Sequence, residues 1–428
     1  MTSEQQKLDD LKEESSLELR DATTHIVDSE HKSAPEVDEG YPYIKTSDIE
    51  NGRIHFDDVS YVDEEAYEEW TRRLTPEPGD IVLTREAPVG RVGIVPEGQQ
   101  VCLGQRTVLI RPDTEILDDQ FLRYLLLTDD VQNRFEALSS GSTVDHLNLS
   151  DLRSYELPDL PNIEDQEKIG RILSNFDEKI KTNQKINEKL EEIAQALFEY
   201  WFVDFEPYEP FKDSERGRIP EKFDVTGLTE IANVVLGGTP DSNEKSYWDG
   251  EIVWAKAKDV SNEQEAFISE TEKNITEKGL EESSTEIAPK NSTIITARGT
   301  VGELAMPAFD MAINQSCYSL VAESEEDRYF IYFLMDAILN NLMSRTHGTV
   351  FDTITKRTLN EQDVVLPPMV DREEFHYQVQ PLMEQIKENQ RENRNLEKLR
   401  DTLLPKLMSS EIRVNDINLE DLEVSSEV

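Results

Sequence analysis

Two long segments of the chain repeat apolar residues at alternating spacings of three and four, the pattern of a helix that packs along one face against a partner. The first seam consists of Leu173, Phe176, Ile180, Asn183, Asn187, Leu190, Ala194, Leu197 and Trp201. The second consists of Val379, Leu382, Ile386, Asn389, Asn393, Leu396, Arg400 and Leu403. Pro161 precedes the first segment and Pro405 lies near the end of the second, consistent with helix boundaries. The pattern predicts two long helices.

Each seam contains two asparagines at successive core positions. A buried asparagine lowers stability but rejects wrong registers, because its amide needs a partner. Antiparallel pairing would place Asn183 near Asn393 and Asn187 near Asn389. We therefore expect helix pairing through Ile180, Asn183, Asn187 and Leu190 on one helix and Ile386, Asn389, Asn393 and Leu396 on the other. The alternative is two separate amphipathic helices, each packed on its own domain.

Outside these segments the pattern predicts mixed α/β domains. Short β-rich runs (GDIVLT, GRVGIV and TVLIR in the first half, STIITA and CYSLVA in the second) are separated by Gly and Pro. A stretch with helical periodicity follows in each half: DDQFLRYLLLTDDVQNRFEAL, then RYFIYFLMDAILNNLMSR. Its apolar residues are expected to lie in the core.

The two halves of the chain match one another. IKTNQKINEKLEE aligns with IKENQRENRNLEK, and in the same order YIKTSDI aligns with WAKAKDV, REAPVG with ARGTVG, LGQR with INQS, and SGSTVDHLNLSDL with HGTVFDTITKRTL. All offsets lie between 206 and 212 positions. This ordered series indicates a tandem duplication, which predicts a pseudo-twofold arrangement rather than a solenoid.

The predicted fold class is therefore mixed α/β, with two tandem globular domains separated by a pair of long antiparallel coiled-coil helices. The expected boundaries are a first domain over 1–160, a helical region over 161–206, a second domain over 207–370, a second helical region over 371–412, and an acidic tail over 413–428. A rod of this kind would hold two similar domains at a fixed separation, as reading a split DNA site requires.

Composition adds an unusual charge. Ninety Asp and Glu against 44 Lys and Arg give a formal net charge of −46, and the excess runs along the whole chain. Two interpretations compete: a surface adapted to concentrated salt, or an acidic body that imitates or repels nucleic acid. We favour the first, which predicts a halophilic source, because the acidic residues are spread so evenly.

The sequence argues against several classes of protein. No apolar run approaches the roughly 20 residues of a membrane span, and the charged N-terminal segment is not a secretory signal, so we expect a cytoplasmic protein. Two cysteines without a CxxC and six scattered histidines exclude a disulfide framework and predict no metal site. Neither GxGxxG nor GxxxxGK[ST] occurs, and we expect a non-catalytic protein without a bound cofactor.

Three segments resemble type I restriction-modification specificity subunits. DLPNIEDQEKIGRILSNFDEKIKTNQKINEKLEEIAQALFEYWFVDFEP is similar to their central conserved region, LEKLRDTLLPKLMSSEIRV to their C-terminal one, and LGGTPDSNEKSYWDGEIVWAKAKDV to the start of a target-recognition domain. The first half has DSEHKSAPEVDEGYPYIKTSDI in place of the last, so the resemblance implies a shared fold with a different target sequence.

The resemblance implies that each recognition domain binds half of a bipartite double-stranded DNA sequence while the helices set the gap between the halves. It further implies that the helices bind two modification (methyltransferase) subunits carrying S-adenosylmethionine. Restriction subunits carrying ATP and Mg would join them in defence against foreign DNA.

Side chains that can contact bases or phosphates occur at matched places in both halves. The candidates for DNA binding are Arg85, Arg91, Gln105, Arg106, Ser139, Ser140, Ser142, Thr143, His146, Lys256, Lys258, Arg298, Gln315, Ser316, Arg345, His347 and Thr349. The alternative, without a role in DNA binding, is that these groups pair with surface carboxylates or cap turns.

Three rival functions remain open at this point. They are a specificity module of another restriction architecture, an acidic DNA mimic with antirestriction activity, and a scaffold whose helices merely join two domains. The repeat and the helix motifs weigh against the last two.

Overall fold

The computed structural model describes residues 17–139, 145–262, 266–345 and 353–416, and the chain divides into two compact units. Unit 1 comprises residues 1–179 and 395–428, and unit 2 comprises residues 180–394. Two helices of 40 residues each, α6 (Ile163–Phe202) and α11 (Met369–Met408), contribute to both units. Each unit is described by itself below.

The remaining elements of unit 1 are strands and short helices. Its strands are β1 (Thr23–Asp28), β2 (Tyr41–Ile44), β3 (Ile49–Glu50), β4 (Arg53–Ile54), β5 (Ser60–Val62), β6 (Ile81–Arg85), β7 (Val89–Ile94), β8 (Cys102–Leu103) and β9 (Thr107–Pro112). Its helices are α2 (Glu64–Thr71), α3 (Asp119–Leu127), α4 (Asp129–Leu138) and α5 (Leu149–Arg153).

Unit 2 has more strands. They are β10 (Phe211–Ser214), β11 (Gly217–Pro220), β12 (Asp224–Gly227), β13 (Ala232–Leu236), β14 (Trp248–Ala255), β15 (Phe267–Ile268), β16 (Asn274–Ile275), β17 (Glu286–Ala288), β18 (Thr293–Thr296), β19 (Leu304–Pro307), β20 (Met311–Ile313), β21 (Cys317–Ala322) and β22 (Asp363–Leu366). Its helices are α7 (Ala257–Asn262), α8 (Glu277–Glu281), α9 (Arg328–Arg345) and α10 (Lys356–Asn360).

The main sheets of the two units have the same topology. In unit 1 the strand order is β1-β9-β6-β7, and in unit 2 it is β13-β21-β18-β19, extended by β15. A second sheet in each unit contains one parallel pair, β2 with β8 and β14 with β20. The β-rich runs recognised in the sequence form β6, β7, β9, β18 and β21. The mixed α/β class and tandem organisation are confirmed.

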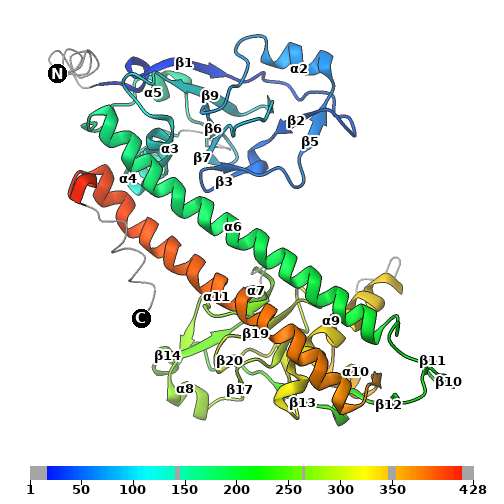
Figure 1. Ribbon diagram of the computed structural model, residues 1–428. Helices are drawn as coiled ribbons and strands as arrows, with labels where there is room; N and C mark the ends of the chain where they lie inside the picture. The colour runs from blue at the N-terminus through cyan, green and yellow to red at the C-terminus, as the bar shows by residue number, and fades with distance from the viewer. Residues whose placement is uncertain (1–16, 140–144, 263–265, 346–352, 417–428) are drawn as a thin grey trace. The chain divides into compact units, whose positions relative to one another are not determined.

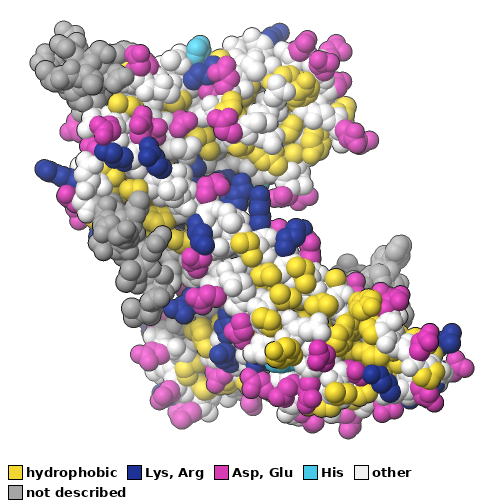
Figure 2. All heavy atoms as spheres, in the orientation of Figure 1, with side chains coloured by type: hydrophobic (Ala, Val, Ile, Leu, Met, Phe, Trp, Pro, Cys, Tyr) yellow, Lys and Arg dark blue, Asp and Glu magenta, His cyan; other side chains and the backbone are white. Residues whose placement is uncertain are grey.

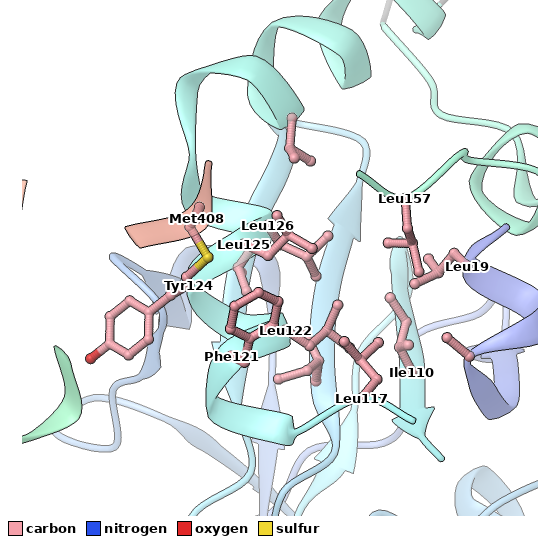
Figure 3. Close-up of a cluster of buried hydrophobic side chains, with 14 of the residues drawn as sticks. Leu19, Ile110, Leu117, Phe121, Leu122, Tyr124, Leu125, Leu126, Leu157 and Met408 are labelled. Atoms are coloured by element: carbon pink, nitrogen blue, oxygen red, sulfur yellow. The ribbon is translucent and has the colours of Figure 1, made fainter. Parts of the chain in front are cut away.

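The core of unit 1 lies between its main sheet and the helices that cover it. Figure 3 shows Phe121, Leu122 and Leu125 of α3 facing Ile110 of β9, with Met408 from the end of α11 close by. Burial of such side chains contributes about 1.5–3 kcal/mol each. Val414 also belongs to this core, although the sequence placed it in an acidic tail.

One predicted helix is in fact two. The stretch over 118–138 breaks at Thr128, which has extended backbone angles and ends α3 as it begins α4. Asp129 and Asp130 follow in the first turn of α4, where their charge suits the positive end of the helix dipole. A threonine before two aspartates is a helix-start signal that the apolar periodicity concealed.

The long helices lie side by side in antiparallel fashion within each unit (Figure 1). In unit 2, Asn183 Nδ2 donates to Asn393 Oδ1 at 2.9 Å, and Asn389 Nδ2 donates to Asn187 Oδ1 at 2.8 Å. All four side chains are buried. Each pair therefore shares one hydrogen bond between the helices, although Nδ2 of Asn393 is buried without a partner among the described residues. The predicted helix pair is confirmed.

A charged contact joins the helices in unit 1. Asp177 of α6 is buried and accepts hydrogen bonds from Arg123 of α3, from Tyr124 at 2.6 Å and from Arg400 of α11 at 2.8 Å. Arg400 thus occupies its expected seam position as an ion-pair partner. One carboxylate connects three elements of the unit.

The surface reflects the composition. Figure 2 shows acidic side chains scattered over the visible face, with few groups of basic ones. Within the described ranges, no helix combines the length and apolarity that crossing a membrane requires.

The asparagine pairs can be tested by substitution. We expect Asn183→Ala to lower the free energy of unfolding by about 1–3 kcal/mol, because it leaves the buried Oδ1 of Asn393 without its donor. Replacing Asn183 and Asn393 together with Leu should restore that stability. Replacing Asn187 and Asn389 with Leu as well should let the helices pair in more than one register, because no seam asparagine then rejects the shifted alignments. Denaturant unfolding measures the first effect, and cross-linking of cysteines placed along the helices measures the second. A double variant as unstable as the single one would contradict this account.

Candidate nucleic-acid interface

Three segments of unit 1 meet where β6 ends. The backbone N–H of Arg85 donates to the carbonyl of Arg106 at 2.8 Å, and the N–H of Leu147 donates to the carbonyl of Arg85 at 3.0 Å. The turn over 86–88 lies beside them, and Thr46 Oγ1 donates to the carbonyl of Ala87 at 3.2 Å. Four loops therefore converge at one edge of the main sheet, which we call the unit 1 edge.

Arg85 lies beneath this edge rather than on it. Its side chain is buried, and its guanidinium donates to Asp28 Oδ2 at 2.5 Å, to His146 Nε2 at 2.9 Å and to the carbonyl of Leu147 at 2.8 Å. These partners use the donors that a base would need. The expectation that Arg85 itself contacts DNA does not fit this placement.

His146 connects Arg85 to Glu86. Because Arg85 has only N–H donors, His146 Nε2 must accept, and the ring proton is therefore on Nδ1. Nδ1 donates to Glu86 Oε1 at 2.5 Å, and the other oxygen of Glu86 lies 3.5 Å from Nε of exposed Arg106. The result is a chain of hydrogen bonds that ends in a half-exposed carboxylate.

The other unit 1 candidates surround this chain. Arg91 is half-buried and donates to the carbonyls of Thr46 and Ile49, and Gln105 contacts Ser33 Oγ at 3.3 Å. Ser139 ends α4 with its hydroxyl donating to the carbonyl of Glu136, and it lines a hollow of about 500 Å³ beside Pro88. Ser140, Ser142 and Thr143 lie outside the described residues.

Unit 2 repeats the backbone arrangement. The N–H of Ala297 donates to the carbonyl of Ser316 at 2.7 Å, and the N–H of Ile354 donates to the carbonyl of Ala297 at 3.0 Å. Ala297 is therefore the structural equivalent of Arg85, and Arg298 is the equivalent of Glu86. We call this arrangement the unit 2 edge.

The unit 2 edge presents several free polar groups. Arg298, Gln315 and Lys258 are exposed, and within the described ranges their side chains have no hydrogen bond or ion pair. Lys256 instead pairs with Glu272 at 2.7 Å, and Ser316 accepts from Ala297 through its carbonyl. Arg345 is the last residue of α9, and its side chain lies outside the described part of the structure. His347 and Thr349 lie wholly outside it.

Sequence reasoning missed Lys45. Its backbone N–H donates to Asp48 Oδ2 at 2.7 Å, just as that of Lys256 donates to Asp259 Oδ2 at 2.8 Å. Its ammonium pairs with Glu36 at 2.7 Å. The alignment of YIKTSDI with WAKAKDV places Lys45 opposite Lys256 and contained the signal that identifies it.

The described residues offer no sign of other chemistry. No group of three or more His, Cys, Asp or Glu in them is arranged to hold a metal ion. Burial raises the pKa of the Cys102 and Cys317 thiols to about 12, so both stay protonated and unreactive at neutral pH.

Two units of equal topology, each with three chain segments joined by the same backbone hydrogen bonds at one sheet edge, and a pair of long helices define a tandem binding protein. The type I restriction modification DNA specificity domain family matches residues 28–192 and 220–398, and the chain belongs to this family. It is similar to the type I restriction enzyme MjaIX specificity subunit of Methanocaldococcus jannaschii, at 31% identity over 365 residues, covering 83% of this chain and 82% of that protein.

Two further comparisons agree. The type I restriction enzyme HindI specificity subunit of Haemophilus influenzae is 24% identical over 438 residues, covering 86% of this chain and 94% of its own. The crystal structure of a type I restriction-modification S subunit from M. genitalium shares the fold, with a TM-score of 0.60 at 18% identity over 92% of this chain and 95% of that one. The predicted family is confirmed, and the chain is a non-catalytic DNA specificity subunit of type I restriction-modification.

Substitution of Arg85 and of Arg298 should change the free energy of unfolding by different amounts. Arg85→Met should lower the free energy of unfolding by about 3 kcal/mol or more, because Asp28 then lacks its ion-pair partner inside the protein. Arg298→Ala should change it by no more than about 0.5 kcal/mol, since the side chain is exposed and has no hydrogen bond or ion pair to the residues that the structure describes. Paired denaturation curves at one salt concentration measure both, and equal losses would show that the burial of Arg85 has been misjudged.

Proposed function

We propose that each unit binds one half of a bipartite DNA site at its edge, with α6 and α11 setting the gap between the halves. The observation that carries the proposal is the repeated backbone linkage, in which Arg85 and Ala297 occupy the same place in two separate units. A duplicated edge suits a target with two half-sites.

The side chains at each edge support this assignment. Arg298, Gln315 and Lys258, which have no hydrogen bond or ion pair among the described residues, can donate to base edges or phosphates. Five further candidates lie at the two edges and already have partners, either long hydrogen bonds or carboxylates, which DNA can replace. They are Arg106, Arg91, Gln105, Lys45 and Lys256. We retain the remaining candidates as DNA contacts: Ser139, Ser140, Ser142, Thr143, Ser316, Arg345, His347 and Thr349.

The proposal extends to the complex. In it, two modification subunits bind the helical regions and supply S-adenosylmethionine, and restriction subunits supply ATP, Mg and cleavage of foreign DNA. The halophilic source inferred from the charge stays a prediction.

An exposed apolar stripe on α6 is evidence that a partner protein docks there. Ile186, Ile193 and Tyr200 follow one another at intervals of seven residues, and each is more than two-fifths exposed. Figure 2 shows hydrophobic side chains gathered over this part of unit 2. A helix from a modification subunit would bury such a stripe.

The gap can be tested by removing one heptad from each long helix. Residues 180–186 and 390–396 face each other, as the pairing of Asn183 with Asn393 shows, and their deletion keeps both the seam and the Asn187–Asn389 contact. Seven residues span about 10 Å of helix, so the spacer in the recognised sequence should shorten by at most about three base pairs.

The measurement is the motif methylated by the assembled complex, read from genomic DNA. Deletion of 180–186 alone serves as the control, because it breaks the antiparallel register and should abolish methylation. An unchanged spacer in an active double deletion would refute the proposal.

The stripe gives a separate test. Ile193→Glu should weaken binding of a modification subunit at least about tenfold, since docking would bury a carboxylate without a partner. Gln184→Glu adds the same charge at an exposed polar position of the same helix and should leave binding unchanged. Titration of the labelled chain with purified modification subunit measures both, and equal effects would remove the stripe as the docking surface.

A further inference from the structure

The two edges differ most at one equivalent position. Glu86 follows the residue whose N–H binds the carbonyl of Arg106, and Arg298 follows the residue whose N–H binds the carbonyl of Ser316. The backbone is the same, but one turn carries a carboxylate and the other a guanidinium. Opposite hydrogen-bonding groups at the same place are what two readers of different half-sites need.

Glu86 is held in place from behind. The chain Asp28–Arg85–His146–Glu86 consists of contacts of 2.5, 2.9 and 2.5 Å, and Arg85 at its centre is buried. Only the outer part of the carboxylate is open, since its side chain is 30% exposed. A fixed acceptor loses little side-chain entropy when it binds a donor.

The charge around Glu86 permits an approach to DNA. Exposed Arg106 lies beside its free oxygen, and Asp28 with Arg85 forms a compensated pair below. With neutral His146, the five groups carry no net charge, in a chain whose total is −46. The repulsion between an isolated carboxylate and phosphates is therefore reduced at this point.

Base chemistry then assigns the partners. A carboxylate only accepts hydrogen bonds, and in the major groove the cytosine amino group is the donor that Glu recognises, whereas guanine presents only acceptors and suits Arg. We propose that Glu86 reads a cytosine in the half-site of unit 1, that Arg298 reads a guanine at the equivalent place in that of unit 2, and that Arg85 and His146 are positioning residues for Glu86. This inference rests on the proposed function of both edges.

The test measures base preference with the full chain assembled with its modification subunits. The complex selects duplexes from a randomised library at one salt concentration, and sequencing gives the base frequencies at each position. Glu86→Gln should reduce the preference for cytosine about tenfold at one position, because the amide accepts from His146 and then turns its N–H₂ toward the base. Glu68→Gln, at an exposed site on α2, is the matched control and should change nothing.

The positioning role has its own variants. His146→Asn keeps a donor where Nδ1 stood and should retain the preference, whereas His146→Phe should reduce it at the same base position as Glu86→Gln. The double variant Glu86→Gln/His146→Phe should lose no more than Glu86→Gln alone, because both changes remove one interaction. Arg298→Ala should relax a guanine in the other half-site, which identifies the half that belongs to unit 2.

The outcomes separate the inference from the function beneath it. A wild-type complex that selects no bipartite motif overturns the proposed function. A wild-type motif that Glu86→Gln leaves unchanged overturns only the inference. A Glu86→Gln chain that melts at a lower temperature and loses every preference of its half-site also overturns it, since Glu86 would then be a structural residue.

Discussion

The structure depends on two buried asparagine pairs between α6 and α11. The apolar residues of a helix seam stabilise many registers almost equally, because a shift of one heptad brings Leu and Ile against similar partners. An amide in such a seam has no partner in the shifted registers and would cost about 1–3 kcal/mol there. The bonds of Asn183 to Asn393 and of Asn389 to Asn187 therefore select one alignment of the two helices. If the helices set the distance between two DNA half-sites, that distance depends on this alignment.

Each unit holds its share of the helices by a related device. In unit 1, Arg123 and Tyr124 of α3 contact Asp177 of α6, and in unit 2 the consecutive residues Arg328 and Tyr329 of α9 contact Glu384 of α11. In both pairs the arginine also lies over the tyrosine ring, at 4.4 and 4.7 Å. Duplication has thus kept the chemistry of attachment, while the turn that carries Glu86 in one unit carries Arg298 in the other. The attachment residues lie on α3 and α9, whereas the residues proposed for recognition lie in the turns after β6 and β18, so each set can change without the other.

Periodicity explains why so much of the fold could be predicted from the sequence. The seams, the strand runs and the matched segments all depend on local spacing, and the pairing of Asn183 with Asn393 followed from the seams alone. The break at Thr128 was missed because capping residues lie within an unbroken apolar rhythm. The burial of Arg85 was beyond local reasoning, since its partners Asp28 and His146 are 57 and 61 positions away. Because about a fifth of the residues are acidic, the sequence alone does not show which carboxylate a given arginine will pair with.

The same charge determines which kind of DNA contact can carry recognition. Phosphate contacts depend on released counterions and weaken steeply as salt increases. A protein with 90 acidic and 44 basic residues has few basic side chains available for phosphate contacts. At the edges, Lys45 and Lys256 are already paired with carboxylates. Hydrogen bonds to bases act at about 3 Å, which is within the screening length even in 1 M salt. An acidic specificity subunit therefore gains more from donors and acceptors directed at bases, the role proposed for Arg298 and Glu86, than from general attraction to the DNA backbone.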